Sequence, residues 1–300
     1  MRLHTLKLTS QTAAALCSVT LSATLVWAQT KVWTTRELFN RNIGTKEQQT
    51  KQFPPHKIIG NMYYVGTETL GSFLVVTPAG NILIDSTYEV NVPVIRKSIE
   101  DLGFKFSDTK ILLGSHAHAD HQEGDAMVKE LTGAKVMAMA EDVPALQNMK
   151  PGGKPHPIDR VLHDGDQVTL GGMILVAHLT PGHTHGDTTW SLKVQDSGKS
   201  YDVVIIGSMG FNGTAQQLLG NPALVAEYEQ GFRVMHSLAC DVPLGSHPAM
   251  YSLVEKYAKL GKGPNPFIDP EGYKTEVAIE EGAYRALLQE KPATPPAVKN

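Results

Sequence analysis

A short run of metal-binding side chains is the most distinctive feature of this 300-residue sequence. From His116 to His121 the chain reads His-Ala-His-Ala-Asp-His, which places three imidazoles and one carboxylate within six residues. These groups would repel or desolvate one another in a loop unless a cation held them together. Zn²⁺ binds histidine nitrogen and carboxylate oxygen well. We therefore interpret the run as a zinc site rather than as a solvated histidine-rich loop.

The spacing within the run divides its ligands between two ions. Side chains alternate along an extended chain, so His116 and His118 project to the same side and can share one ion. Asp120 and His121 follow where the chain turns toward a helix, and they can reach a second ion nearby. Neither set is complete, so we expect further ligands from distant segments.

Two later loops offer the missing histidines. His183 lies in Thr-Pro-Gly-His-Thr between two expected strands, and His247 lies in Ser-His-Pro after another apolar segment. His185 repeats the spacing of the first histidine pair, so it remains an alternative to His183 as a ligand. Other histidines look like ordinary surface, turn or sheet residues: His56, His156, His163 and His178.

Together these motifs resemble the metallo-β-lactamase superfamily, most closely its subclass B3 lactamases. The resemblance covers nearly all of residues 29–300 and implies an α/β fold, an αββα sandwich with two mixed sheets between outer helices and two zinc ions at one edge. It also implies hydrolysis of the β-lactam amide bond of penicillins, cephalosporins and carbapenems by a metal-bound hydroxide that Asp120 orients. Carried over residue by residue, the ligands would be His116, His118 and His183 for one zinc, and Asp120, His121 and His247 for the other.

One position separates the substrate classes within the superfamily. Glyoxalase II-like thioesterases and many lactonases place a metal-bridging Asp where this chain has Ser208. Subclasses B1 and B2 have Cys there and B3 enzymes have Ser, so the resemblance implies that Ser208 binds the substrate carboxylate. A secreted lactonase, or another dizinc hydrolase of the superfamily, remains the alternative, and a non-catalytic zinc-binding protein is a third hypothesis.

Several residues depart from the B3 pattern. Gln122 and Glu123 follow the first motif where small residues are usual, and His185 and Asp187 replace a Pro and a small residue after the third zinc histidine. Gly210 stands where several B3 enzymes carry a second serine that helps to hold the substrate carboxylate. These departures bear on affinity and substrate range rather than on the dizinc centre.

Two polar residues near expected strand ends are candidates to orient the ligands. Asp85 ends one strand, and Ser115 lies beside His116, where each could fix the tautomer of a ligating histidine. Asp85 fits a plain turn equally well.

The pattern of apolar residues predicts the elements that position these motifs. Three strands, over 57–65, 71–77 and 81–85, precede a helix over 90–102 and a strand that leads to His116. The second half repeats this order, with short strands between 160 and 206 and then helices over 222–238, 249–260 and 271–288. No linker rich in Pro, Gly or Ser separates the halves, so we expect a single domain over residues 29–300.

The first 28 residues look like a cleaved secretory signal. They carry Arg2 and Lys7 but no acid, continue with an apolar run of about 16 residues, and end at Ala28 in Val-Trp-Ala. The run is shorter than the ~20 residues that span a bilayer, although an uncleaved anchor remains the alternative. We therefore expect a periplasmic or secreted protein without stable membrane association.

Loss of the signal also changes the charge and the cysteine content. Removing Arg2 and Lys7 takes the formal net charge from -3 to -5, so no positive field attracts nucleic acid. We expect a small-molecule β-lactam substrate and no obligate protein partner.

Cys17 leaves with the signal, so Cys240 is predicted to be a free thiol. Many B3 enzymes link this position to the C-terminal helix by a disulfide, where Tyr273 stands here.

Overall fold

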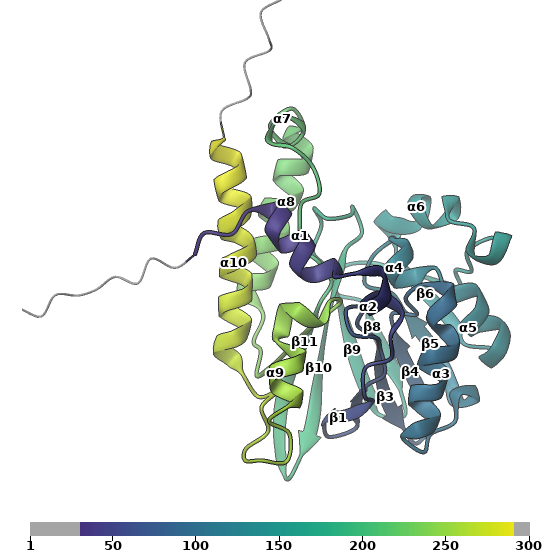
Figure 1. The fold of residues 1–300 in the computed structure, drawn as a ribbon. Coiled ribbons are helices and arrows are strands. Elements are labelled where there is room, and N and C mark those ends of the chain that lie inside the picture. Colours follow the sequence, from purple (N-terminus) through teal and green to yellow (C-terminus); the bar gives the residue numbers. More distant parts are fainter. Residues whose placement is uncertain (1–30, 291–300) are drawn as a thin grey trace, which may run out of the picture. The chain divides into compact units, whose positions relative to one another are not determined.

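Two β-sheets pack against each other between outer helices in the computed structural model, which describes residues 31–290 (Figure 1). The expected signal peptide, Cys17 and the tail after residue 290 lie outside the described residues. Within the described part of the chain, residues 32–290 belong to one compact unit. Across the described residues, no helix combines the length and the apolar composition that crossing a bilayer requires.

The first sheet contains seven strands that lie side by side in sequence order. They are β1 (His56–Ile59), β2 (Met62–Tyr64), β3 (Phe73–Thr77), β4 (Gly80–Ile84), β5 (Thr109–Leu113), β6 (Lys135–Met139) and β7 (Arg160–Leu162). Strands β1 to β4 pair antiparallel, and β4 to β7 pair parallel. The single strand expected over 57–65 is instead a hairpin, because Gly60 turns the chain at a φ of 51°. A side chain at Gly60 would collide with Val194.

The second sheet contains five strands in the order β12-β11-β10-β9-β8. They are β8 (Gln167–Leu170), β9 (Met173–Leu179), β10 (Thr188–Asp196), β11 (Lys199–Ile206) and β12 (Val242–Gly245). Only β11 and β12 pair parallel, while the other neighbours pair antiparallel. Both sheets are therefore mixed, as the sequence predicts.

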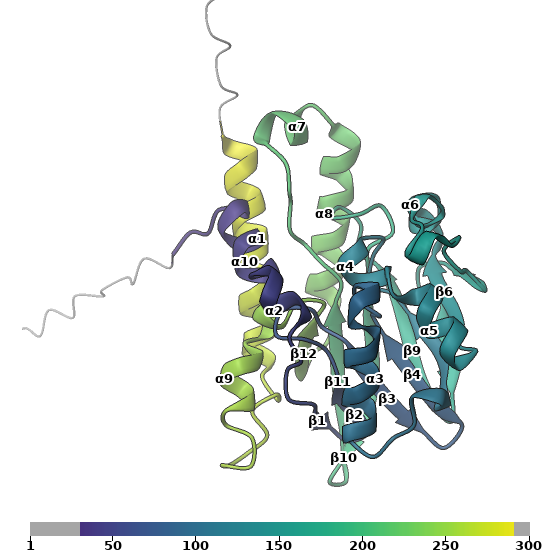
Figure 2. The same cartoon turned by 45° about the vertical axis from the view of Figure 1, so that its right-hand side comes forward.

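Helices cover the outer faces of both sheets (Figure 2). The helices of residues 31–290, including those at the edge of the sandwich, are α1 (Thr35–Ile43), α2 (Lys46–Thr50), α3 (Val92–Asp101), α4 (Ala119–Gln122), α5 (Asp125–Thr132), α6 (Val143–Asn148), α7 (Ala215–Leu219), α8 (Pro222–Ser237), α9 (Leu253–Tyr257) and α10 (Pro270–Gln289). The helix expected over 249–260 is wrong in extent, because Ser252 adopts a φ of 55° and separates a 3₁₀ turn from α9. Helices α1 and α2 lie in a segment for which the apolar pattern predicts no element.

Alternating side chains in the strands build the core. Along β5, Ile111 and Leu113 face the second sheet, whereas Leu112 packs toward α3 and α5. Between the sheets, Trp190 of β10 is almost fully buried, and its indole N–H donates to the carbonyl of Gly114 at 3.1 Å. This contact ties the second sheet to the end of β5, where the ligand-rich run begins. The αββα sandwich predicted from the sequence is confirmed.

Candidate metal centre

Five loops meet at one edge of the sandwich, each after the carboxyl end of a strand. They follow β4, β5, β9, β11 and β12. Backbone hydrogen bonds tie this edge together. Thr188 N–H, at the start of β10, donates to the Ser115 carbonyl at 2.8 Å, and Gly71 N–H, in the loop between β2 and β3, donates to the Ser246 carbonyl at 2.7 Å. Polar side chains from distant parts of the sequence are thereby held together on a rigid frame.

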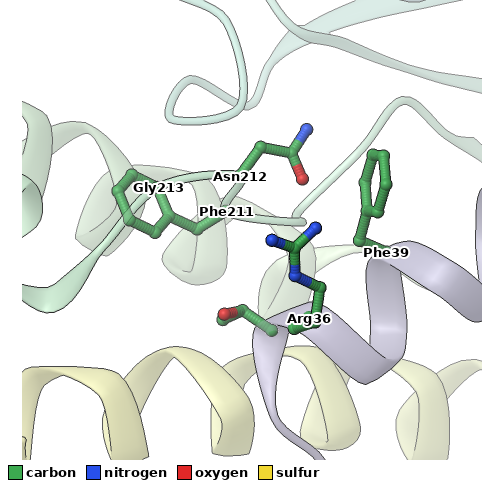
Figure 3. Close-up of a pocket in the computed structure, with 6 residues that line it drawn as sticks. Arg36, Phe39, Phe211, Asn212 and Gly213 are labelled. Atoms are coloured by element: carbon green, nitrogen blue, oxygen red, sulfur yellow. The ribbon is translucent and has the colours of Figure 1, made fainter.

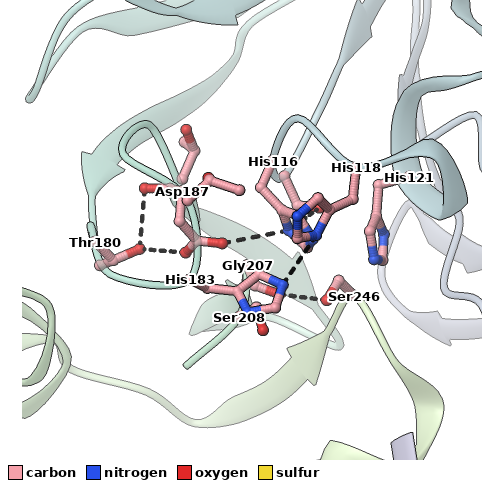
Figure 4. A network of polar contacts seen from close by, with 12 residues as sticks. His116, His118, His121, Thr180, His183, Asp187, Gly207, Ser208 and Ser246 are labelled. Carbon is pink, nitrogen blue, oxygen red and sulfur yellow. Dashed lines mark hydrogen bonds and ion pairs between the residues drawn. The ribbon is translucent and has the colours of Figure 1, made fainter. Parts of the chain in front are cut away.

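The structure brings the six expected ligands together in two groups. Figure 4 shows His116, His118 and His183 close together, with His121 nearby. The first group is His116, His118 and His183, and the second is Asp120, His121 and His247. Within each group, the ligand atoms all lie within 4.8 Å of one another. The ring centroids of His116 and His121 are 4.2 Å apart, so the two groups adjoin.

The first group has the dimensions of a zinc site. His183 Nε2 lies 3.1 Å from His118 Nδ1. Two ligands of a tetrahedral zinc with bonds of about 2.0–2.1 Å would be roughly 3.3 Å apart. His116 Nε2 is buried and has no hydrogen-bond partner. A buried nitrogen is seldom left unpaired, so its environment fits a bond to a metal ion.

The protein holds the other ring nitrogen of two histidines in this group. His183 Nδ1–H donates to the Gly210 carbonyl at 2.6 Å. His116 Nδ1 lies 3.3 Å from Asp187 Oδ1 and 3.3 Å from the Ser115 hydroxyl. These contacts select the tautomer that leaves Nε2 free to bind a cation. Asp187, which departs from the B3 pattern, therefore lies in contact with a predicted ligand.

The second group is oriented in the same way. His121 Nδ1 lies 3.2 Å from Asp85 Oδ2, and His247 Nδ1–H donates to the Thr69 carbonyl at 3.0 Å. The Nε2 atoms of both histidines face Asp120 Oδ2, at 3.4 Å from His121 and 3.8 Å from His247. The three groups thus surround a common space that a cation can occupy.

Asp85 is the residue that links strand β4 to this second group. One carboxylate oxygen accepts the Ser115 backbone N–H at 2.7 Å, and the other accepts the Ser115 hydroxyl at 2.9 Å besides facing His121. The residue is almost fully buried and has a φ of 61°, which side chains rarely adopt. Asp85 therefore both makes the turn and orients a predicted ligand.

Most of the ligand imidazoles are neutral, which is the form that binds metal. Burial, with the neighbouring imidazoles, lowers the pKa of His183 to about 3. The same causes, with burial again the largest, lower the pKa of His247 to about 4 and hold the pKa of His116 well below its usual range. These rings would bind a cation without first losing a proton.

His121 and Asp120 behave differently because they form an ion pair. Burial alone would lower the pKa of His121, but the carboxylates of Asp120 and Asp85 outweigh it and raise this pKa to about 10. Burial would raise the pKa of Asp120, yet the charges of His121 and His247 hold it far below its usual range. A metal ion entering this group would replace the proton on His121.

Asp142 is a supporting residue that no sequence pattern singles out. It accepts the Ala117 backbone N–H at 2.7 Å, the Thr184 hydroxyl at 2.8 Å and the Gly186 N–H at 2.8 Å. Burial raises the pKa of this carboxyl. Asp142 joins the loop after β5 to the loop after β9, so it sets the positions of ligands from both.

Among the other histidines, the expectation of a surface or turn position is wrong for His156. Its ring is buried, with Nε2 3.3 Å from Asp125 Oδ2 and 3.2 Å from the Gln122 carbonyl. Ser86 donates to the other oxygen of Asp125 at 2.6 Å. The loop carrying His156 folds inward under α4, which its Pro- and Gly-rich composition does not predict. His56 is also buried, in contact with the rings of Phe53, Tyr64 and Phe267.

His178 and His185 are separate from the ligand groups. His178 Nε2 lies 2.7 Å from the Ser191 hydroxyl across the β9–β10 pair, as expected of a sheet histidine. The side chain of His185 is 72% exposed, and its Nδ1 lies 2.8 Å from Glu227 Oε1. Of the two histidines in this loop, the structure brings His183 and not His185 to the ligand group.

A cleft of about 210 Å³ opens over both ligand groups. It is lined by Phe39, Asn42, Ile43, Tyr88, His118, Asp120, His183, Ser208, Gly210, Asn212 and His247. Ser208 therefore lines this cleft, whereas Gly210 offers no side chain there. The wall formed by α1 is held to α10 because Arg41 pairs with Glu276 and Glu280.

Comparisons with known proteins agree with this geometry. A family model described as the metallo-beta-lactamase superfamily matches residues 71–214. The FEZ-1 metallo-beta-lactamase from Legionella gormanii is 47% identical in a match that covers 79% of this chain and 96% of that one, with a TM-score of 0.75. The subclass B3 metallo-beta-lactamase BJP-1 of Bradyrhizobium japonicum is 33% identical, with 80% and 95% covered and a TM-score of 0.73.

Curated relatives match over shorter segments. The hydroxyacylglutathione hydrolase of Methylobacterium sp. (strain 4-46) is 31% identical over 104 residues, which are 34% of this chain and 36% of that protein. The hydroxyacylglutathione hydrolase of Maricaulis maris is 28% identical over 171 residues, 57% of its length. The chain thus matches about a third to somewhat over half of these two proteins. Since a 47% identical relative is covered over nearly its whole length, the chain belongs to the metallo-beta-lactamase superfamily.

Proposed function

We propose that the protein is a subclass B3-like β-lactamase that hydrolyses the β-lactam amide bond of penicillins, cephalosporins and carbapenems with two zinc ions. The observation that carries this proposal is the 47% identity to a metallo-beta-lactamase over 96% of that enzyme. The two ligand groups beside one cleft support it, because three protein ligands per ion leave an open position for substrate or water.

In this proposal the zinc ligands are His116, His118 and His183 for one ion, and Asp120, His121 and His247 for the other. Bound zinc would polarise the amide carbonyl and lower the pKa of water to about 7. The protein contributes the fixed positions of the ligands and of the cleft wall. Asp120 stays ionised, so its carboxylate can accept a hydrogen bond from the attacking water and orient it.

Ser208 is the residue that we assign to the substrate carboxylate. It lines the cleft together with His118 and His183, so its hydroxyl can donate to an anion bound beside the metal ligands. Gly210 presents only its backbone there, and its carbonyl already accepts from His183 and from the Tyr228 hydroxyl. With one hydroxyl in place of two, we expect a raised KM more than a lowered kcat.

Thioester hydrolysis is the second candidate, because hydroxyacylglutathione hydrolases match part of the chain. The loop after β11 argues against it. Residues 207–213 include no carboxylate, and Ser208 stands where thioesterases and many lactonases of the superfamily place a bridging Asp. A secreted lactonase is disfavoured for the same reason.

A panel of substrates tests the proposal. Zinc-replete protein would be assayed with a chromogenic cephalosporin, a carbapenem, an acyl-homoserine lactone and S-lactoylglutathione, with chelator-treated protein as the control. We expect turnover of both β-lactams and loss of that turnover in chelator. Turnover of the lactone or the thioester without turnover of either β-lactam would overturn the assignment.

We also propose that the protein acts in the periplasm or outside the cell after cleavage at Ala28, without nucleic acid, stable membrane association or an obligate protein partner. The net charge of the chain and its apolar N-terminal run support this location. Amino-terminal sequencing of protein recovered from the periplasm should start at Gln29. Recovery of the intact N-terminus in the membrane fraction would contradict it.

A further inference from the structure

Positive charge is scarce around the cleft. Three cavities of about 210, 740 and 140 Å³ adjoin one another, because Asn212 lines all of them. Among the described residues that line these cavities, Arg36 of α1 is the only lysine or arginine. Carboxylates line the same space, namely Asp120, Glu141 and Asp142. An anionic substrate would therefore meet one permanent side-chain cation of the protein near the metal ligands.

Arg36 also differs from most other arginines in residues 31–290. Arg41, Arg96, Arg160 and Arg285 each have a carboxylate oxygen within 3.5 Å. Within the same range, Arg36 has no hydrogen bond or ion pair with another side chain. Its guanidinium is left with its donors free for a ligand.

The position of Arg36 is fixed by its helix. Thr34 and Glu37 form a capping box at the start of α1, and Arg41 anchors the same helix to α10. Figure 3 shows the Arg36 guanidinium pointing toward the Asn212 amide, with Phe39 beside it. The cavity between them, about 140 Å³, has room for a small charged group. Because the helix is anchored, binding an anion would order the Arg36 side chain but not the backbone that carries it.

We propose that Arg36 and the Asn212 amide form an anion subsite for a carboxylate on the substrate side chain, separate from the ring carboxylate assigned to Ser208. This inference rests on the proposed β-lactamase function. The guanidinium can bind a carboxylate through two parallel N–H bonds, while the amide of Asn212 donates a third. Substrates with a second negative charge would gain affinity that singly charged ones lack.

Two penicillins isolate this contribution. Carbenicillin is benzylpenicillin with one added side-chain carboxylate, so the pair differs only in the group that the subsite would bind. For Arg36→Ala we expect the KM of carbenicillin to rise about tenfold, as loss of about 1.4 kcal/mol would give. The KM of benzylpenicillin should change less than about twofold, because this substrate lacks the side-chain carboxylate. Both kcat values should also change less than about twofold, because a contact that binds substrate and transition state equally well affects KM and not kcat.

Two further variants control for indirect effects. Arg36→Lys keeps the positive charge but lacks the planar guanidinium with its paired N–H donors. Its KM for carbenicillin should therefore lie between those of wild type and Arg36→Ala. Arg233→Ala removes an exposed arginine of α8 that lines none of the three cavities, and it should leave both KM values unchanged. If Arg36→Ala raises both KM values equally, or neither, the subsite does not exist.

Binding without turnover separates this inference from the proposed function. Chelator-treated protein would be titrated by calorimetry with each penicillin. Tighter binding of carbenicillin than of benzylpenicillin, lost in Arg36→Ala and kept in Arg233→Ala, supports the subsite even if the zinc-loaded protein hydrolyses neither compound. Equal binding of the two penicillins to wild-type protein overturns the subsite even if both are hydrolysed.

Discussion

His183 and His185 lie two residues apart, and their surroundings give them different roles. The ring of His183 is held by the Gly210 carbonyl at 2.6 Å and faces His118, whereas His185 pairs with Glu227 at the surface. A ligand needs both a fixed ring and a free nitrogen that faces the other ligands. Only His183 meets both conditions, although the spacing in the sequence suits either residue.

The matched pair of alanine variants tests this difference. His183→Ala should lower zinc affinity by more than the roughly 10- to 100-fold typical of losing a supporting residue, because it removes a bond to the ion itself. His185→Ala should retain the zinc content of the wild-type protein. Elemental analysis after dialysis against dilute zinc measures both, and the reverse ranking would show that the wrong histidine was chosen.

Cys240 is the remaining cysteine of the expected mature chain, and the structure gives it no disulfide partner among the described residues. Burial raises its pKa to about 12. Native protein at pH 8 should therefore react slowly with a thiol reagent, since the thiolate is the reactive form. Denatured, non-reduced protein should give one thiol per chain. A covalent dimer on a non-reducing gel would contradict this.

Among the elements, helices α1 and α10 are joined by a buried charged cluster. Arg41 pairs with Glu276 and lies 3.4 Å from Glu280, and all of these carboxylate groups are nearly buried. Burial, with the charge of Glu276, raises the pKa of Glu280 to about 8. Because α1 supplies one wall of the cleft, this cluster holds that wall against α10.

Stability should depend on pH through Glu280. Its pKa in the folded state lies above its ordinary value, so the folded protein holds a proton that the unfolded chain releases between about pH 4.5 and 8. Unfolding therefore becomes easier as the pH rises through this range. Glu280→Gln mimics the protonated group, so its stability relative to wild type should increase by about 1 kcal/mol or more from pH 5 to pH 8.

Urea denaturation at several pH values, at constant zinc, measures this difference. Glu271→Gln is the matched control, because it removes an exposed carboxylate from the same helix. A difference between Glu280→Gln and wild type that does not change with pH would rule out Glu280 as the titrating group.

The parts of the fold and site that sequence predicts are those with local patterns. The run from His116 to His121 concentrates ligands in six residues, and the apolar strand before it is just as local. Asp142 and His156 escape prediction because their partners, such as Ala117 and Asp125, are 25 and 31 residues away in the sequence. Helix α1 is not predicted from the apolar pattern, because its nine residues bury little apolar surface of their own.

At the scale of the whole molecule, a cation bound by these ligands would contribute to the stability of the fold. His116 Nε2 is buried without a hydrogen-bond partner, at the edge of the sandwich where the loops converge. Unpaired buried nitrogens cost free energy that a bound cation would remove. The folded state should therefore be stabilised by zinc as well as activated by it.

Chelation should lower both activity and the melting temperature, and added Zn²⁺ should restore both. With free zinc at 100 times its Kd, the stabilisation would be about 2.7 kcal/mol per site. Elemental analysis of the restored protein should give two zinc ions per chain, in agreement with the two ligand groups. One tightly held ion in a fully active preparation would contradict the dinuclear proposal.

The ion pairs between Arg41 and α10 also bear on the order in which the cleft is completed. The partners of these pairs are 235 and 239 residues apart in the sequence, with both sheets between them. Contacts that close such long loops tend to form late in folding, because chain entropy opposes them until the intervening elements have packed. The metal ligands could therefore assemble on the sheets before α1 docks. A chain caught at that stage would hold zinc at an open edge, with no wall to select what approaches it.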